Sequence, residues 1–144
     1  MKTDHKELQE ICDLIRFSKS NRGVKRYLNF GLLPEDVVSK ALLKDIDLTD
    51  FRLFIDTSGI NHVLKRHGHD SDLAAHGELP ICIMDLLFFK TYLLNFDFIE
   101  QNADSLMFYN NHVKHTNVTI CEMRISDSKG RRLYLKTMYN KKRL

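Results

Sequence analysis

The chain has 144 residues, of which 43% are hydrophobic and 28% charged, and its formal net charge is +3. This length fits one globular domain, and the composition excludes intrinsic disorder as the default state. The mild positive charge admits a polyanionic partner without requiring one.

The first part of the chain is predicted to alternate helices and strands. Apolar residues at helical spacing predict an amphipathic helix over residues 4–19, and β-branched and aromatic residues predict a strand over 24–33. Pro34 suits the first turn of a helix that extends to Ile46. Residues 50–56 are predicted to form a second strand.

A short histidine-rich helix is predicted over residues 57–67. Thr57 or Ser58 can cap its start. Gly68 can adopt the left-handed conformation just past its end. The polar segment 69–80 that follows is typical of a long loop, and such loops often carry function.

The second part of the chain is predicted to contain a buried helix over residues 81–95 and strands at 105–110, 117–126 and 131–140. The sequence DSKG joins the last two strands as a hairpin. This order of elements predicts an α+β fold, in which helices pack on one face of a small antiparallel sheet.

The cysteines and the apolar stretches indicate in which cellular compartment the protein is expected. Three cysteines without a CxxC pair indicate buried free thiols in a reducing compartment. The N-terminal residues lack the apolar region of a signal peptide. The longest apolar stretch, near residues 81–94, is interrupted by Asp85 and Lys90 and is too short to span a membrane. We therefore expect a cytoplasmic protein without a membrane partner.

The stretch INHVLKRHGHD, residues 60–70, combines three histidines with a lysine and an arginine. His62 and Arg66 share a helix face because residues four apart are neighbours. His67, next to the terminating glycine, can turn toward the same cleft and is expected near solvent. Metal-free RNA cleavage needs such groups: one imidazole to remove the 2′-OH proton, a second acid for the leaving 5′-oxygen, and a cation for the phosphate.

Two other interpretations of this stretch stay open. The basic side chains could simply compensate the negative end of the helix dipole. They could also belong to a metal site, although no spacing matches a zinc pattern and no cysteine lies near; the candidate ligands would be His62, His67, His69 and His76, with Asp70 or Asp72. We expect no metal and no other cofactor.

The residues GINHVLKRHG, followed by LKTMYN at residues 135–140, resemble the phage-associated nucleases of the barnase–EndoU–colicin–RelE superfamily. Members of that group carry an H-[IV]-x-x-[KR]-H-G helix end and finish on a strand with a hydroxyl residue and a tyrosine. The upstream segments YLNFGLL and ALLKDIDLTDFRLFIDTSGI are similar too, so the resemblance covers roughly residues 25–140.

The resemblance implies a curved antiparallel sheet with helices on one face, in a nuclease domain at residues 23–144 that follows an N-terminal helix at 1–22. It also implies a site in which four residues converge on one cleft, with catalytic roles for His62, His67, Thr137 and Tyr139. On chemical grounds we add substrate-binding roles for Lys65, Arg66 and Lys136.

The last strand gives a mixed indication of where that cleft lies. By strict alternation, Thr137 and Tyr139 share a face with Leu133 and Leu135. The site is therefore expected at the end of the strand, beyond the apolar part of this face. Packing of Tyr139 in the core is the alternative.

Together these features predict a metal-independent endoribonuclease that acts as a toxin or as a phage or defence effector. It would cleave RNA, with tRNA among the candidates, by 2′-OH transesterification. An immunity or antitoxin protein would be a further partner. The alternative is a catalytically inactive module of the same fold that binds RNA or a protein.

Overall fold

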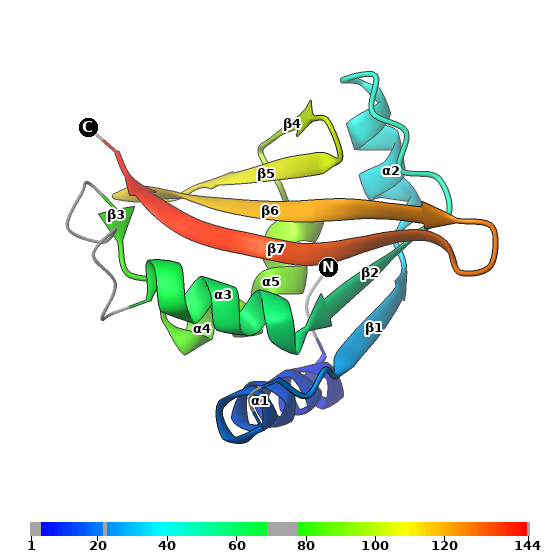
Figure 1. The fold of residues 1–144 in the computed structure, drawn as a ribbon. Helices are drawn as coiled ribbons and strands as arrows, with labels where there is room; N and C mark the ends of the chain where they lie inside the picture. The colour runs from blue at the N-terminus through cyan, green and yellow to red at the C-terminus, as the bar shows by residue number, and fades with distance from the viewer. Residues whose placement is uncertain (1–3, 22, 69–77, 144) are drawn as a thin grey trace.

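An N-terminal helix precedes a sheet whose strands are interleaved with short helices (Figure 1). The computed structural model describes residues 4–21, 23–68 and 78–143. In chain order the elements are α1 (His5–Ser20), β1 (Tyr27–Leu32), α2 (Glu35–Leu42), β2 (Phe51–Asp56), α3 (Thr57–His67), β3 (Glu78–Leu79), α4 (Ile83–Leu87), α5 (Phe89–Leu94), β4 (Phe98–Asn102), β5 (Ser105–Asn111), β6 (His115–Ser126) and β7 (Gly130–Lys142).

The strands form one mixed sheet in the order β1-β2-β7-β6-β5-β4, with β3 paired to the end of β7. The pairs are antiparallel except β2 and β7, which run parallel where Phe51–Phe54 lie beside Arg131–Tyr134. The predicted α+β class is confirmed. The parallel pair joins segments far apart in the chain, so no local pattern indicates it.

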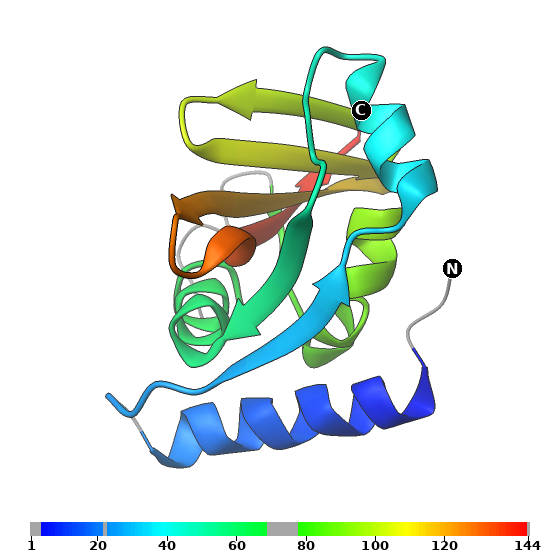
Figure 2. The ribbon, with the colours of Figure 1, turned by 90° about the vertical axis from the view of Figure 1, so that its right-hand side faces the viewer.

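The hydrophobic core lies between the sheet and the helices. Leu133, Leu135 and Met138 of β7 are buried there, together with Phe108 of β5 and Phe89 of α5. Figure 2 shows α2 and α5 on the same side of strands β4 to β7. This arrangement agrees with the prediction for the helical segment 81–95, whereas α3, which was predicted on the same face, lies close to the backbone of β7 at Leu135.

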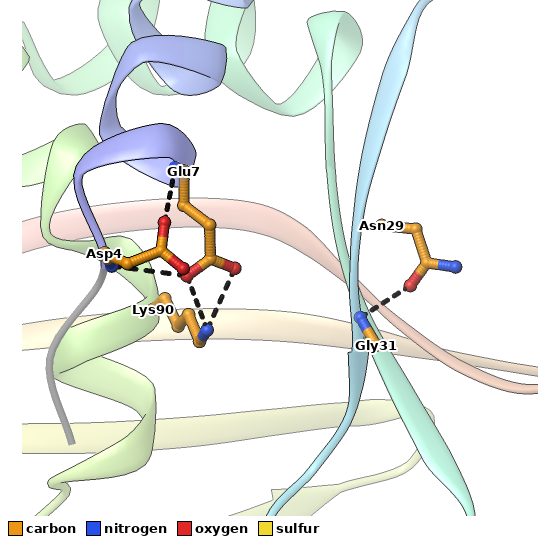
Figure 3. A network of polar contacts seen from close by, with 5 residues as sticks. All are labelled: Asp4, Glu7, Asn29, Gly31 and Lys90. Carbon is orange, nitrogen blue, oxygen red and sulfur yellow. Dashed lines mark hydrogen bonds and ion pairs between the residues drawn. The ribbon is translucent and has the colours of Figure 1, made fainter.

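Helix α1 lies below β1 in Figure 2 and is fixed to the body of the protein at its first turn. A capping box joins Asp4 and Glu7, in which the Asp4 carboxylate accepts from the Glu7 backbone N–H at 2.8 Å. The Glu7 carboxylate also binds Nζ of Lys90 in α5, at 2.7 and 2.9 Å (Figure 3). Because Ile11 and Ile15 are buried in the main core, α1 packs as part of the same folded unit.

Helix α3 begins differently from the prediction. Capping by Thr57 or Ser58 is wrong: Asp56 is the cap, and its carboxylate accepts from the Gly59 backbone N–H at 2.8 Å. Gly59 also sets the distance between α3 and β7, since a Cβ there would lie 2.3 Å from the carbonyl oxygen of Leu135. The helix therefore runs close beside the second half of β7.

The end of α3 also differs from the prediction. Gly68 is not left-handed, because its φ of −78° and ψ of −174° are extended. Glycine fits there for a different reason: a Cβ would lie 2.4 Å from the carbonyl oxygen of Leu64. The carbonyl oxygen of His67 accepts from the Ile81 backbone N–H at 2.7 Å, which ties the helix end to the segment before α4.

The helix predicted over residues 81–95 is divided into α4 and α5. Phe88 separates them, with φ −91° and ψ 10°, and its ring is partly exposed. Two strands were absent from the prediction, and both carry weak signals: β3 has two residues, and β4, FIEQN, ends on three polar ones. No helix of the described residues is long and apolar enough to cross a membrane.

Candidate active site

A bulge in β7 decides which side chains share a face. Opposite β6, the register passes from Leu135 directly to Thr137, so Lys136 is an extra residue. Met138 and Asn140 consequently join the buried face of Leu135. The alternation assumed from the sequence is therefore wrong: Thr137 and Tyr139 lie on the opposite face of the sheet, here called the outer face.

The histidine helix brings two imidazoles beside that outer face. The ring centroids of His67 and Tyr139 are 5.6 Å apart, and those of His62 and His67 are 6.4 Å apart. His62 is exposed, whereas His67 is only 9% exposed. The expectation that His67 lies near solvent is therefore wrong, although its ring stands between the other two.

The Glu78 carboxylate, which was not among the predicted site residues, contacts His67. Glu78 of β3 lies 3.0 Å from Nδ1 of His67, and both side chains are largely buried. Glu78 is placed by the pairing of β3 with β7, where it lies opposite Lys141. Among the described residues, Nε2 of His67 has no hydrogen-bond partner. The only sequence signal for Glu78 is an acidic residue soon after the histidine motif.

The charges around His62 act in one direction. Partial burial lowers the pKa of His62, and the nearby positive charges of Arg66, His67 and Lys136 lower it further. A lowered pKa keeps this imidazole neutral at neutral pH, which is the form that accepts a proton. Arg66 and Lys136, both exposed, thus lie close enough to His62 to act on the same ligand.

The two predicted site residues of β7, Thr137 and Tyr139, carry hydroxyls that have no hydrogen-bond partner among the described residues. Burial raises the pKa of Tyr139, and the carboxylates of Glu78 and Glu100 raise it further, so its phenol stays protonated and can donate a hydrogen bond. Among the described residues, neither Tyr139 Oη nor Thr137 Oγ1 has a hydrogen-bond partner, and Thr137 Oγ1 is buried. Buried hydroxyls are usually paired, so an unpaired one needs an explanation.

His62, His67 and Tyr139 are called the histidine cluster here, and not every predicted site residue lies beside it. Lys65 lines a cavity of about 640 Å³ with Lys19, Asn61 and Leu64, on the side of α3 that faces α1. The metal candidates of the segment after α3, which are His69, Asp70, Asp72 and His76, lie outside the described residues. Within the described part of the chain, no three histidine, cysteine or acidic residues are grouped as metal ligands.

Comparison with known families identifies the chain. A family described as phage-Barnase-EndoU-ColicinE5/D-RelE like nuclease, PBECR3, matches residues 34–143. The chain belongs to this family. The PBECR3 match includes α3 and β7, the two elements that carry the cluster, and it confirms the resemblance inferred from the sequence. No curated protein and no solved structure matches the chain.

Proposed function

We propose that this protein is a metal-independent endoribonuclease that cleaves RNA by attack of a ribose 2′-oxygen on the adjacent phosphorus. The bond from phosphorus to the 5′-oxygen breaks, and the products are a 2′,3′-cyclic phosphate and a 5′-hydroxyl. The observation that carries the proposal is the position of His67, bound to Glu78 and flanked by the rings of His62 and Tyr139.

His62 is the proposed general base. Its lowered pKa leaves the imidazole unprotonated at neutral pH, so it can take the proton from the 2′-hydroxyl as the 2′-oxygen attacks. Its exposure leaves it accessible to a ribose. No metal is needed for this step, because the base itself removes the proton.

His67 is the proposed general acid. The Glu78 carboxylate accepts a hydrogen bond from Nδ1, which fixes that nitrogen as a donor and leaves Nε2 as the atom that exchanges protons with substrate. Protonated on Nε2, the ring would give a proton to the 5′-oxygen as its bond to phosphorus breaks. Glu78 acts on His67, not on the substrate, and is therefore a positioning residue.

The remaining groups suit the charge that develops on the phosphate. Tyr139 keeps its phenolic proton and can donate it in a hydrogen bond to a phosphate oxygen. The hydroxyl of Thr137, which has no partner among the described residues, lies on the same face and is the second proposed donor. Arg66 and Lys136 supply positive charge beside His62. Donors fixed before substrate arrives stabilise the transition state without reorganisation.

RNA is the proposed substrate, with tRNA as one candidate, and the protein would serve as a toxin or as a phage or defence effector. An immunity or antitoxin protein is proposed as a partner that blocks the site. A catalytically inactive binding module of the same fold is the second candidate. The burial of His67 and its bond to Glu78 favour that reading, since a satisfied buried histidine can be purely structural.

Cleavage of total cellular RNA in the presence of a chelator tests the proposal. We expect fragments that end in 2′,3′-cyclic phosphate, with activity unaffected by the chelator. The inactive module predicts intact RNA. Activity that disappears on chelation and returns with an added transition metal would point to the metal site instead, and elemental analysis would then find bound metal.

A further inference from the structure

Next to the histidine cluster, the outer face of the sheet carries a groove of about 560 Å³. A row of cross-strand neighbours forms its floor: Phe98 pairs with Tyr109, Tyr109 with Val118, and Val118 with Tyr139. Four adjacent strands at the usual spacing make this row about 14 Å long, longer than one nucleobase. Tyr139 belongs to both sites, since its ring also lies beside His67.

The groove offers ring surface held in fixed positions. Phe98 is 42% exposed, and its ring centroid lies 5.6 Å from that of Tyr109. The Tyr109 hydroxyl donates to Glu100, which orients the ring. Exposing the apolar ring of Phe98 to water is unfavourable in the free protein. A flat ligand that covers the rings of Phe98 and Tyr109 removes this surface from water, which favours binding.

The rim of the groove is positively charged. Lys141, Lys142 and Arg143 line it at the end of β7, and Nζ of Lys44 lies 5.2 Å from the Phe98 ring centroid at the other end. Within the described ranges 4–21, 23–68 and 78–143, neither Lys141 nor Lys142 has a carboxylate partner. Arg143 donates to the carbonyl oxygen of His112 at 2.8 Å, which holds the end of the strand in place.

We propose that this groove binds the unpaired nucleotides next to the scissile phosphate, with bases stacked on Phe98 and Tyr109 and phosphates on Lys141 and Lys142. The assignment rests on the proposed nuclease function for the position of the cleaved bond. Ring faces can stack only on bases that are not already stacked in a duplex, so the groove favours single-stranded RNA. The basic rim supplies the phosphate contacts that such binding requires.

Binding of a 2′-O-methyl oligonucleotide, measured by fluorescence anisotropy, tests the groove separately from catalysis, because the blocked 2′-oxygen prevents cleavage. We expect the parent protein to prefer the single strand to its duplex. Phe98→Ala should weaken single-strand binding about tenfold, the scale of one lost stacking contact, and Phe98→Trp should preserve it. Lys141→Gln should reduce the dependence of log Kd on log salt by about 0.7.

Tyr27→Ala is the matched control, since Tyr27 is an aromatic of β1 that is 66% exposed and lies outside the groove. The proposal is overturned if the parent does not bind the single strand, if it prefers the duplex, or if Phe98→Ala weakens binding no more than Tyr27→Ala. Cleavage of the unmodified RNA by the parent is measured in parallel. Cleavage without an effect of Phe98→Ala refutes only the groove, whereas selective loss of binding without any parental cleavage refutes only the nuclease.

Discussion

Polar side chains are hydrogen-bonded to one another on the core side of β7, whereas Thr137 and Tyr139 on its outer face lack such partners among the described residues. On the core side, the carboxylate of Asp85, itself only 9% exposed, accepts from the Tyr92 hydroxyl and the Cys82 backbone N–H at 2.9 Å each. Asn140 of β7 joins the same network and accepts from Asn117 at 2.9 Å. This set, called the core network here, comprises Cys82, Asp85, Tyr92, Asn117 and Asn140.

The outer face carries similar groups without such pairing. Burial and a nearby carboxylate raise the pKa of both Tyr92 and Tyr139. Tyr92 donates to Asp85, however, whereas Tyr139 has no hydrogen-bond partner among the described residues. A polar group that is satisfied internally stabilises the fold, and one that is left unpaired at a surface remains available to a ligand. The contrast therefore distinguishes the paired polar groups on the core side of β7 from the candidate site groups on its outer face.

Replacing Asp85 with alanine should produce the largest change in stability. The substitution leaves the Tyr92 hydroxyl and the Cys82 N–H without an acceptor in a partly buried site, and we expect the unpaired donors to cost about 3 kcal/mol in total. Urea denaturation measures it. Asp127→Ala, at an exposed turn, is the control and should change the free energy of unfolding little. Equal stabilities of the two variants would show that the core network is not structural.

Removing the charge of Glu78 should affect catalysis more than stability. Glu78→Gln can still accept from Nδ1 of His67, so it should cost less activity than Glu78→Ala, for which we expect a loss of about tenfold or more in kcat. The pH profile of kcat should move in both variants, because the group acts through the histidine. A change in KM alone, with kcat and its pH profile unaltered, would contradict the positioning role.

Two threonines on opposite faces of the hairpin offer a matched pair. Thr119 donates to Asn117 at 2.8 Å in the core, whereas Thr137 Oγ1 is unpaired among the described residues. Thr119→Val should therefore destabilise the protein by about 1 kcal/mol, and Thr137→Val should leave stability unchanged or slightly raised. RNA cleavage should fall several-fold only in Thr137→Val. If both variants show the same change in melting temperature and in cleavage rate, the distinction between a structural Thr119 and a site residue Thr137 is wrong.

The smallest effect concerns protonation of His62. Because its folded-state pKa is lowered, His62 should titrate below 6.5 in an NMR experiment. The unfolded chain then binds more protons as the pH falls below 6.5, so the folded protein loses stability there. Arg66→Gln should raise the pKa toward its ordinary value, and Lys65→Gln, on the side facing α1, should not. A midpoint above 6.5 in the parent would refute the assignment of His62 as a neutral base.

Much of the fold is readable from local patterns, since apolar spacing and the turn DSKG locate α1, α3 and the β6–β7 hairpin. What the sequence does not reveal depends on contacts between distant segments. Asp56 caps α3 because the chain enters the helix directly from β2. The parallel pairing of β2 with β7 joins the two halves of the protein.

The site shows the same division. His62 and His67 are found from their spacing on one short helix. The position of Tyr139 depends on the bulge at Lys136, because the extra residue moves Thr137 and Tyr139 to the opposite face of the sheet. No residue type in the sequence indicates this bulge. Glu78 reaches His67 only because β3 pairs with the end of β7. The candidate reacting groups can thus be predicted from the sequence, whereas their hydrogen-bond and ring partners depend on tertiary contacts.

The most direct test of the account is the single-turnover cleavage rate of an oligoribonucleotide, measured in chelator for three proteins. We expect His67→Ala to lose about 100-fold or more relative to the parent, the scale of one missing acid–base group. His112→Ala is the control, because His112 belongs to a separate histidine pair in which its ring centroid lies 4.6 Å from that of His115. The cleavage rate of this variant should equal that of the parent. If His67→Ala cleaves as fast as the parent while remaining folded, His67 is a structural residue and the proposed mechanism is wrong.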